Sequence, residues 1–107
     1  MKKIFLDSLK LKTFTEQDAL DYCSIDNINP NDITELFLSF NKLTDITGIK
    51  IFKNLKLLYL TQNKLTDISV LKDLNKLIDI SISNNKIKDI SLIQYLTKIK
   101  YLNICNL

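Results

Sequence analysis

The residues that most often carry out catalysis are sparse in this chain. It has no histidine, and its two cysteines, Cys23 and Cys105, lie near opposite ends of the sequence. Histidine is the commonest general base and a common metal ligand, and a nucleophilic thiol needs such a base beside it. No phosphate-binding loop and no metal-ligand spacing occurs in the sequence. The sequence therefore predicts that the protein is not an enzyme and has no catalytic residue, metal or cofactor.

Lysine accounts for all fifteen basic side chains, and the net charge is +3. Residues 1–32 contain four lysines and six acidic residues (−2), whereas residues 33–107 contain eleven lysines and six acidic residues (+5). Readout of base edges relies on arginine, which is missing here, so we expect no nucleic-acid partner.

No stretch approaches the ~20 apolar residues of a membrane helix, so we expect no membrane partner. The basic start MKKIFLDSLK is interrupted by Asp7 too early for a signal peptide. Two cysteines without such a signal suit reduced thiols. We expect a cytoplasmic protein, with secretion as an effector by another route as the alternative.

A 22-residue unit is repeated through most of the chain. The copies are ITELFLSFNKLTDITGIKIFKN (33–54), LKLLYLTQNKLTDISVLKDLNK (55–76) and LIDISISNNKIKDISLIQYLTK (77–98), followed by the partial copy IKYLNICNL (99–107). Each complete copy has apolar residues at unit positions 1, 4, 6, 11, 14, 17 and 20. In the first copy these are Ile33, Leu36, Leu38, Leu43, Ile46, Ile49 and Phe52.

The spacing of these apolar residues changes within the unit. Positions 4 and 6 alternate, as they do on one face of a strand. Positions 11, 14, 17 and 20 recur every third residue, which favours a 3₁₀ or short helical return. Neither half buries its apolar side alone, so the copies must stack, with their strands aligned in a parallel sheet.

Two polar positions repeat as faithfully as the apolar ones. Position 9 is asparagine in every complete copy: Asn41, Asn63 and Asn85. We predict a structural ladder in which each amide bonds the turn backbone of its own coil and of a neighbouring coil. Position 13 is aspartate in every complete copy: Asp45, Asp67 and Asp89. We predict that these carboxylates cap the free N–H groups of the return segment.

The pattern L-x-x-L-x-L-x-x-N-x-L-x-D-I resembles the leucine-rich repeat, in the 22-residue subtype of bacterial internalins and of phosphatase-regulating repeat subunits. The resemblance covers residues 33–106, and Leu107 stands where the fourth asparagine belongs. It implies an α/β fold: a curved right-handed solenoid with a concave parallel sheet and a convex side of 3₁₀ or short helices.

The two ends of the chain depart from the repeat. We predict that residues 1–32 form an N-terminal cap, with an edge strand at 8–13 and a helix at about 16–23. Thr15 and Asp18 have the spacing of a capping box at the start of that helix. Residues 33–107 form the repeat domain. The strand in 99–107 either belongs to a longer array or pairs with a second copy of the chain in a homodimer.

The concave sheet is the predicted binding surface, because solenoids bind partners there. Its outward positions carry aromatic residues beside polar ones, the composition of interface hot spots. The predicted anchors are Phe37, Tyr59 and Tyr101, and the predicted flanking contacts are Phe40, Leu57, Glu35 and Asp79. Two sheet spacings, about 10 Å, separate Glu35 from Asp79, too far for an acid–base pair.

The sequence thus predicts a non-catalytic protein–protein interaction module that binds another protein or a peptide. Two alternatives remain. One is a small inhibitor, such as an immunity protein that blocks a toxin. The other is a structural end of a longer repeat array that has no partner of its own.

Overall fold

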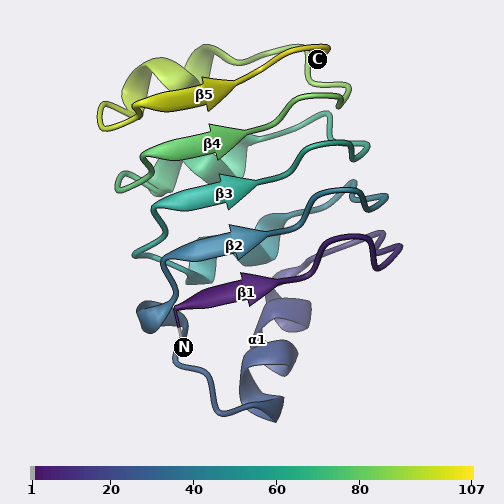
Figure 1. The fold of residues 1–107 in the computed structure, drawn as a ribbon, viewed down its shortest axis with the longest axis vertical. Helices are drawn as coiled ribbons and strands as arrows, with labels where there is room; N and C mark the ends of the chain where they lie inside the picture. The colour runs from purple at the N-terminus through teal and green to yellow at the C-terminus, as the bar shows by residue number, and fades with distance from the viewer. Residues whose placement is uncertain (1) are drawn as a thin grey trace.

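Short parallel strands, one in each coil, line one side of the chain (Figure 1). In the computed structural model, which describes residues 2–107, the sheet has five strands in sequence order. They are β1 (Lys3–Phe5), β2 (Glu35–Phe37), β3 (Leu57–Tyr59), β4 (Asp79–Ser81) and β5 (Tyr101–Asn103). From β2 onward each residue pairs with the residue 22 positions later, as Leu36 does with Leu58. The predicted parallel stack of equal coils is confirmed.

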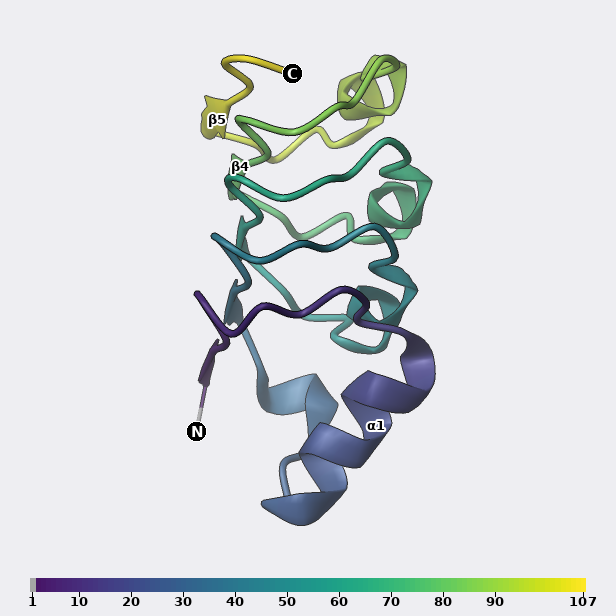
Figure 2. The ribbon, with the colours of Figure 1, turned by 90° about the vertical axis from the view of Figure 1, so that its right-hand side faces the viewer.

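Short 3₁₀ helices lie along the side opposite the sheet (Figure 2). They are η2 (Thr47–Ile51), η3 (Ser69–Asp73) and η4 (Ser91–Tyr95), and η1 (Pro30–Asp32) precedes β2. The repeated apolar positions fill the space between sheet and helices; all seven of the first copy are at most 3% exposed. The expected strand and 3₁₀ return are therefore both present in each complete copy.

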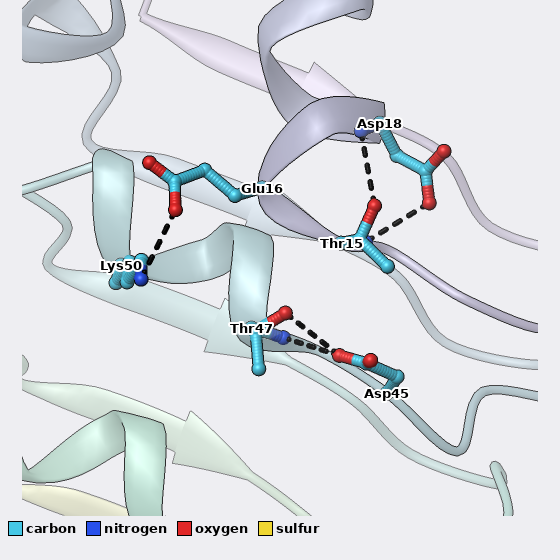
Figure 3. Close-up of polar contacts among 6 residues, drawn as sticks. All are labelled: Thr15, Glu16, Asp18, Asp45, Thr47 and Lys50. Atoms are coloured by element: carbon cyan, nitrogen blue, oxygen red, sulfur yellow. Dashed lines mark hydrogen bonds and ion pairs between the residues drawn. The ribbon is translucent and has the colours of Figure 1, made fainter.

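An aspartate lies two residues before the start of each of the helices η2, η3 and η4. Its carboxylate accepts a hydrogen bond from the backbone N–H of the first residue of that helix. The Asp45 Oδ1 atom accepts from the Thr47 N–H at 2.9 Å (Figure 3). The equivalent N–H donors to Asp67 and Asp89 lie at 2.7 and 2.9 Å. Backbone hydrogen bonds of this kind lower the pKa of both Asp67 and Asp89, because they stabilise the charged carboxylate.

The asparagines at position 9 lie one above another inside successive bends, each about 8% exposed or less. The Asn63 Nδ2 group donates to the carbonyl of Leu60 in its own coil at 3.1 Å and to that of Leu38 in the preceding coil at 3.0 Å. Its Oδ1 atom accepts from the N–H of Leu43 at 3.0 Å. Asn85 repeats this arrangement one coil later. Each amide therefore satisfies buried backbone groups of two coils at once.

Replacing Asn63 with alanine is expected to lower the free energy of unfolding by about 2–4 kcal/mol, because the Leu43 N–H and the Leu38 carbonyl would lose a buried partner. Chemical denaturation measures the change. The exposed neighbour Lys64, changed to alanine, is the control and should shift stability by no more than about 0.5 kcal/mol. Equal effects of the two substitutions would contradict the ladder's role.

The predicted edge strand at 8–13 is wrong. The edge strand before α1 is β1, which lies earlier in the chain, at Lys3–Phe5. β1 pairs with β2 through Ile4 and Leu36, and Ile4 is fully buried. Residues 8–13 do not continue as a strand because Ser8 and Lys10 both have a φ of 59°, outside the extended region. Of this segment only Thr13 forms a β-bridge, with Asp45.

Residues 3–14 form an additional coil in register with the repeats, although the sequence analysis placed them outside. Along this coil Ile4, Leu6, Thr13 and Phe14 align with residues 32 positions later, and Thr13 pairs with Asp45. The spacing is 32 rather than 22 because α1 is inserted between this coil and the first complete copy. The insertion hides the repeat from any search at constant period.

Helix α1 spans Glu16–Ile25, two residues beyond the predicted end. Its N-terminus has the predicted capping box: the Asp18 N–H donates to Thr15 Oγ1 at 3.2 Å, and the Thr15 N–H donates to Asp18 Oδ2 at 2.9 Å (Figure 3). Ala19 and Cys23 are buried, and the Glu16 carboxylate pairs with the Lys50 ammonium of η2 at 3.1 Å. The helix lies at the β1 end of the stack (Figure 2). That it serves as a cap stays a prediction.

Gly48, the one glycine of the chain, belongs to η2 and packs against the backbone of Phe14 and Thr15, just before α1. Its N–H donates to the Phe14 carbonyl at 2.8 Å, and a Cβ placed on it would be 2.7 Å from that carbonyl oxygen and closer still to that of Thr15. Later coils have Val70 and Leu92 at this position, since no helix start presses on them. The close approach of two backbones therefore requires glycine here.

A Gly48→Ala substitution is expected to lower the free energy of unfolding by about 1–3 kcal/mol, because two backbone oxygens must move to admit the methyl group. Thermal or chemical denaturation provides the measurement. Val70→Ala, at the same position one coil later, removes half-buried atoms without creating a clash and serves as the comparison. An unchanged or raised stability in Gly48→Ala would show that α1 does not hold the backbone in place.

Candidate binding face

Two columns of side chains project from the sheet on the face away from the core. The column at unit position 5 consists of Phe5, Phe37, Tyr59, Ser81 and Asn103. The column at unit position 3 consists of Lys3, Glu35, Leu57, Asp79 and Tyr101. Strand pairing aligns both columns, and the residues between them, at position 4, point to the opposite face, where those of β1 to β4 are buried in the core.

Aromatic rings occupy the first three places of the position 5 column. Phe5 and Phe37 stack with ring centroids 4.6 Å apart and planes 7° from parallel. Phe37 and Tyr59 meet edge to face at 5.6 Å. Phe5 is 62% exposed and belongs to this column, yet the sequence analysis missed it. The signal was the alternation of Ile4 with Leu6, which marks a strand outside the period of 22.

Polar groups sit beside the aromatic column. The Tyr59 hydroxyl donates to Asp79 Oδ2 at 2.8 Å, and this hydrogen bond is the main reason that the pKa of Tyr59 is raised. Partial burial and the nearby carboxylates of Asp79 and Glu35 raise it further. Glu35 pairs with the Lys3 ammonium at 3.6 Å. Leu57 lies between Glu35 and Asp79, so the two carboxyl groups do not form an acid–base pair.

A hollow of about 590 Å³ lies over β3, β4 and β5. It brings together three of the residues predicted to bind a partner, Tyr59, Asp79 and Tyr101, one from each strand. The remaining lining residues are Thr61, Ile80, Ser81, Lys100, Leu102 and Asn103. Tyr101 is 65% exposed, whereas Tyr59 and Asp79 are half-buried.

Serines at outward positions serve the sheet itself. Ser39, Ser81 and Ser83 are each at most 8% exposed, although their unit positions face away from the core. The Ser39 hydroxyl accepts from the Thr61 N–H at 3.1 Å, and the Thr61 and Ser81 hydroxyls bond at 2.6 Å. These serine side chains are short and buried, whereas the neighbouring aromatic side chains extend further from the sheet, so the face is uneven rather than flat.

Phe40 lies at the turn that follows β2 rather than on a strand. Its φ is 57°, in the left-handed region that bulky residues seldom adopt, and it is 53% exposed. The equivalent residues of the next coils are Gln62, Asn84 and Asn106, all with a φ of 55–57°. Phe40 is therefore a strained and exposed aromatic residue at one edge of the face, apart from the two columns.

Changing Phe40 to asparagine is expected to raise the free energy of unfolding by about 0.5–1 kcal/mol, because asparagine tolerates the left-handed conformation better. Denaturant titration of the variant gives the value. Gln62→Asn, at the same turn one coil later, should gain less because glutamine is unbranched and has no ring. A loss of stability in Phe40→Asn would mean that the ring contributes packing that outweighs the strain.

The described residues contain little that could support chemistry. Cys23 is buried, which raises the pKa of its thiol, and Cys105 is exposed in the last coil. Within residues 2–107 no group of three or more histidine, cysteine, aspartate or glutamate side chains is placed to hold a metal ion. None of the helices in this range has the length and apolar content to span a bilayer.

Comparisons with known proteins agree with this architecture. The family described as "Leucine Rich repeats (2 copies)" matches residues 32–73. Among solved structures, the chain is similar to the crystal structure of an internalin (inlF) from Listeria monocytogenes str. 4b F2365, with a TM-score of 0.78 and 26% identity. The match covers 98% of this chain but 28% of the internalin, so the chain spans less than a third of that protein. No curated protein matches the chain.

Proposed function

We propose that this chain, in which residues 32–73 match the leucine-rich repeat family, is a non-catalytic module that binds one protein or peptide on its sheet face. Leucine-rich repeat domains generally act as protein–protein interaction modules. The observation that carries the proposal is the row of aromatic rings along β1, β2 and β3, from Phe5 through Phe37 to Tyr59.

This row has the properties of an interface core. Phe37 and Tyr59 are held by their neighbours in the column, so ordering them on binding costs little conformational entropy. Phe5 and Tyr101 are 62% and 65% exposed, so a partner would remove a large apolar area from water. Interface hot spots are enriched in aromatic residues of this kind, surrounded by polar groups.

The size of the face limits the partner. Five strands about 4.8 Å apart span roughly 20 Å. Stable interfaces between globular proteins use about 20–30 residues per side, more than the two columns supply. The face therefore suits an extended peptide or one helix of a larger protein, with Phe37, Tyr59 and Tyr101 as anchors and Leu57, Glu35 and Asp79 beside them. Phe40 would contact only a partner that reaches the turn edge.

Substituting Tyr101 with alanine is expected to weaken partner binding by about tenfold, in the range of a hot-spot residue, with little change in melting temperature because the ring is exposed. Phe5→Ala should act in the same direction. Tyr95→Ala is the matched control: Tyr95 is 70% exposed on η4, on the side opposite the sheet. Binding is measured by affinity capture with quantitative mass spectrometry, followed by calorimetry with the recovered partner.

The same measurements separate this proposal from its alternatives. An inhibitor of the immunity type would capture one toxin at equal stoichiometry and abolish its activity. A structural end of a longer array would capture nothing that Tyr101→Ala releases. A partner that is lost equally in Tyr95→Ala and Tyr101→Ala would contradict binding at the sheet. The homodimer through residues 99–107 stays a prediction; all three residues of β5 are exposed.

A further inference from the structure

We propose that the hollow over β3, β4 and β5 receives a basic side chain of the partner, with the Asp79 carboxylate as its counter-charge. The inference rests on the proposed function, because it specifies what the partner presents at one end of the sheet. Its basis is the juxtaposition of one carboxylate with two tyrosine rings in a cavity of about 590 Å³.

The Asp79 carboxylate is held in place with bonding capacity left over. The Tyr59 hydroxyl donates to its Oδ2 atom at 2.8 Å, which fixes the rotation of the carboxylate. The side-chain hydrogen bonds of Asp79 within residues 2–107 involve Oδ2 alone. An ionised carboxylate accepts about four hydrogen bonds in total, so Oδ1 and part of Oδ2 remain free for a donor.

Asp79 also carries a negative charge that no ion pair within residues 2–107 neutralises. Within the part of the chain that the structure describes, the ion pairs are Lys3 with Glu35 and Lys50 with Glu16. Glu35, the other carboxylate of the position 3 column, is thus neutralised by Lys3. No lysine ammonium of residues 2–107 lies within 4 Å of the Asp79 carboxylate, although Asp79 is half-buried. A partner group that covered it without supplying positive charge would leave a carboxylate desolvated and unpaired.

Two aromatic rings flank the carboxylate. Tyr101 neighbours Asp79 in the position 3 column, and Tyr59 lies one strand away on the other side, joined to it by the hydrogen bond. A cation near a ring face is attracted by the electron-rich surface of the ring, and arginine is the side chain that stacks in this way most often. Thr61 and Ser81 also line the hollow, but their hydroxyls bond each other at 2.6 Å, so the Asp79 carboxylate is the principal acceptor for the cation.

One group opposes the bound cation. Lys100 lines the hollow from the residue before β5 and is exposed to solvent. Its ammonium carries the same sign as the ligand, so it should weaken binding modestly through a screened interaction. The geometry therefore makes two opposite predictions: removal of the Asp79 charge weakens cation binding, and removal of the Lys100 charge strengthens it.

The experiment is an NMR titration of the ¹⁵N-labelled protein with N-acetyl-arginine amide and N-acetyl-lysine amide at low ionic strength. N-acetyl-citrulline amide, the neutral analogue of the arginine probe, is the ligand control. We expect saturable shifts in β4 and β5 with the charged probes and none with citrulline. Saturation by both charged probes identifies a general cation site, and saturation by arginine alone identifies a guanidinium site.

Variants assign the site to Asp79. Asp79→Asn, which keeps the shape and an acceptor for Tyr59, should lower affinity about fivefold, as expected for a partly exposed ion pair. Lys100→Gln should raise it about twofold. Glu35→Gln is the matched carboxylate control, because Glu35 is already paired with Lys3, and should leave binding unchanged.

The inference is overturned if no charged probe saturates, if citrulline binds equally, or if Asp79→Asn binds like the native chain. These failures differ from failure of the proposed function. A captured partner that Tyr101→Ala releases, together with unchanged capture and probe binding in Asp79→Asn, would leave a binding face without a cation site. A partner released by neither Tyr101→Ala nor Phe5→Ala would remove the proposed function itself.

Discussion

The buried asparagine amide at each turn is the constraint on which the rest of the structure depends. A coil that turns inward after three strand residues buries backbone groups that neither the sheet nor water can satisfy. One side chain satisfies these groups only if the preceding coil is stacked in register with its own, since the Asn63 amide donates to the carbonyls of both Leu38 and Leu60. A coil out of register at the turn would misplace that amide. The 32-residue interval before β2 keeps this register, since Asn41 still donates to the Leu6 carbonyl at 2.9 Å. The register of the turns is therefore fixed by hydrogen bonding as well as by packing of the leucines.

Because the coils are of equal length from β2 onward, residues at the same unit position form a column. Some columns pack in the core, and others face outward, where a partner can bind. Position 4 is buried in β1 to β4, so its residues must remain aliphatic. Positions 3 and 5 project outward and are free to differ between coils. The chain uses that freedom unevenly: the rings of Phe5 and Phe37 dominate one end of the sheet, and Asp79 with its two tyrosines occupies the other. One end of the sheet with stacked rings and a paired charge, and another with an unpaired carboxylate, would fix the direction in which an extended partner lies.

How much the sequence predicts depends on whether a residue follows the period. The parallel strands, the 3₁₀ returns, the capping aspartates and the inward asparagines all recur every 22 residues, so their positions follow from stacking. The coil at residues 3–14 was missed because α1 lengthens that interval to 32, and Phe5 was missed with it. The period also does not predict how far an outward residue is exposed. Ser39 and Phe40 both follow β2, yet Ser39 is buried and accepts from the Thr61 N–H, whereas Phe40 is exposed at a turn.

The two ends of the sheet differ in how firmly their neighbours hold them, and this bears on the hollow. β1 belongs to a coil braced by α1, through the Phe14 carbonyl on the Gly48 N–H and the pair of Glu16 with Lys50. β5 pairs with β4 on one side, and its three residues are all exposed. Segments with few buried contacts open at lower free energy than the core. A ligand held between Asp79 of β4 and Tyr101 of β5 would therefore add contacts to a strand whose residues are all exposed. Binding there would stabilise the sheet as well as recognise the ligand, because any species that binds only the closed arrangement favours it.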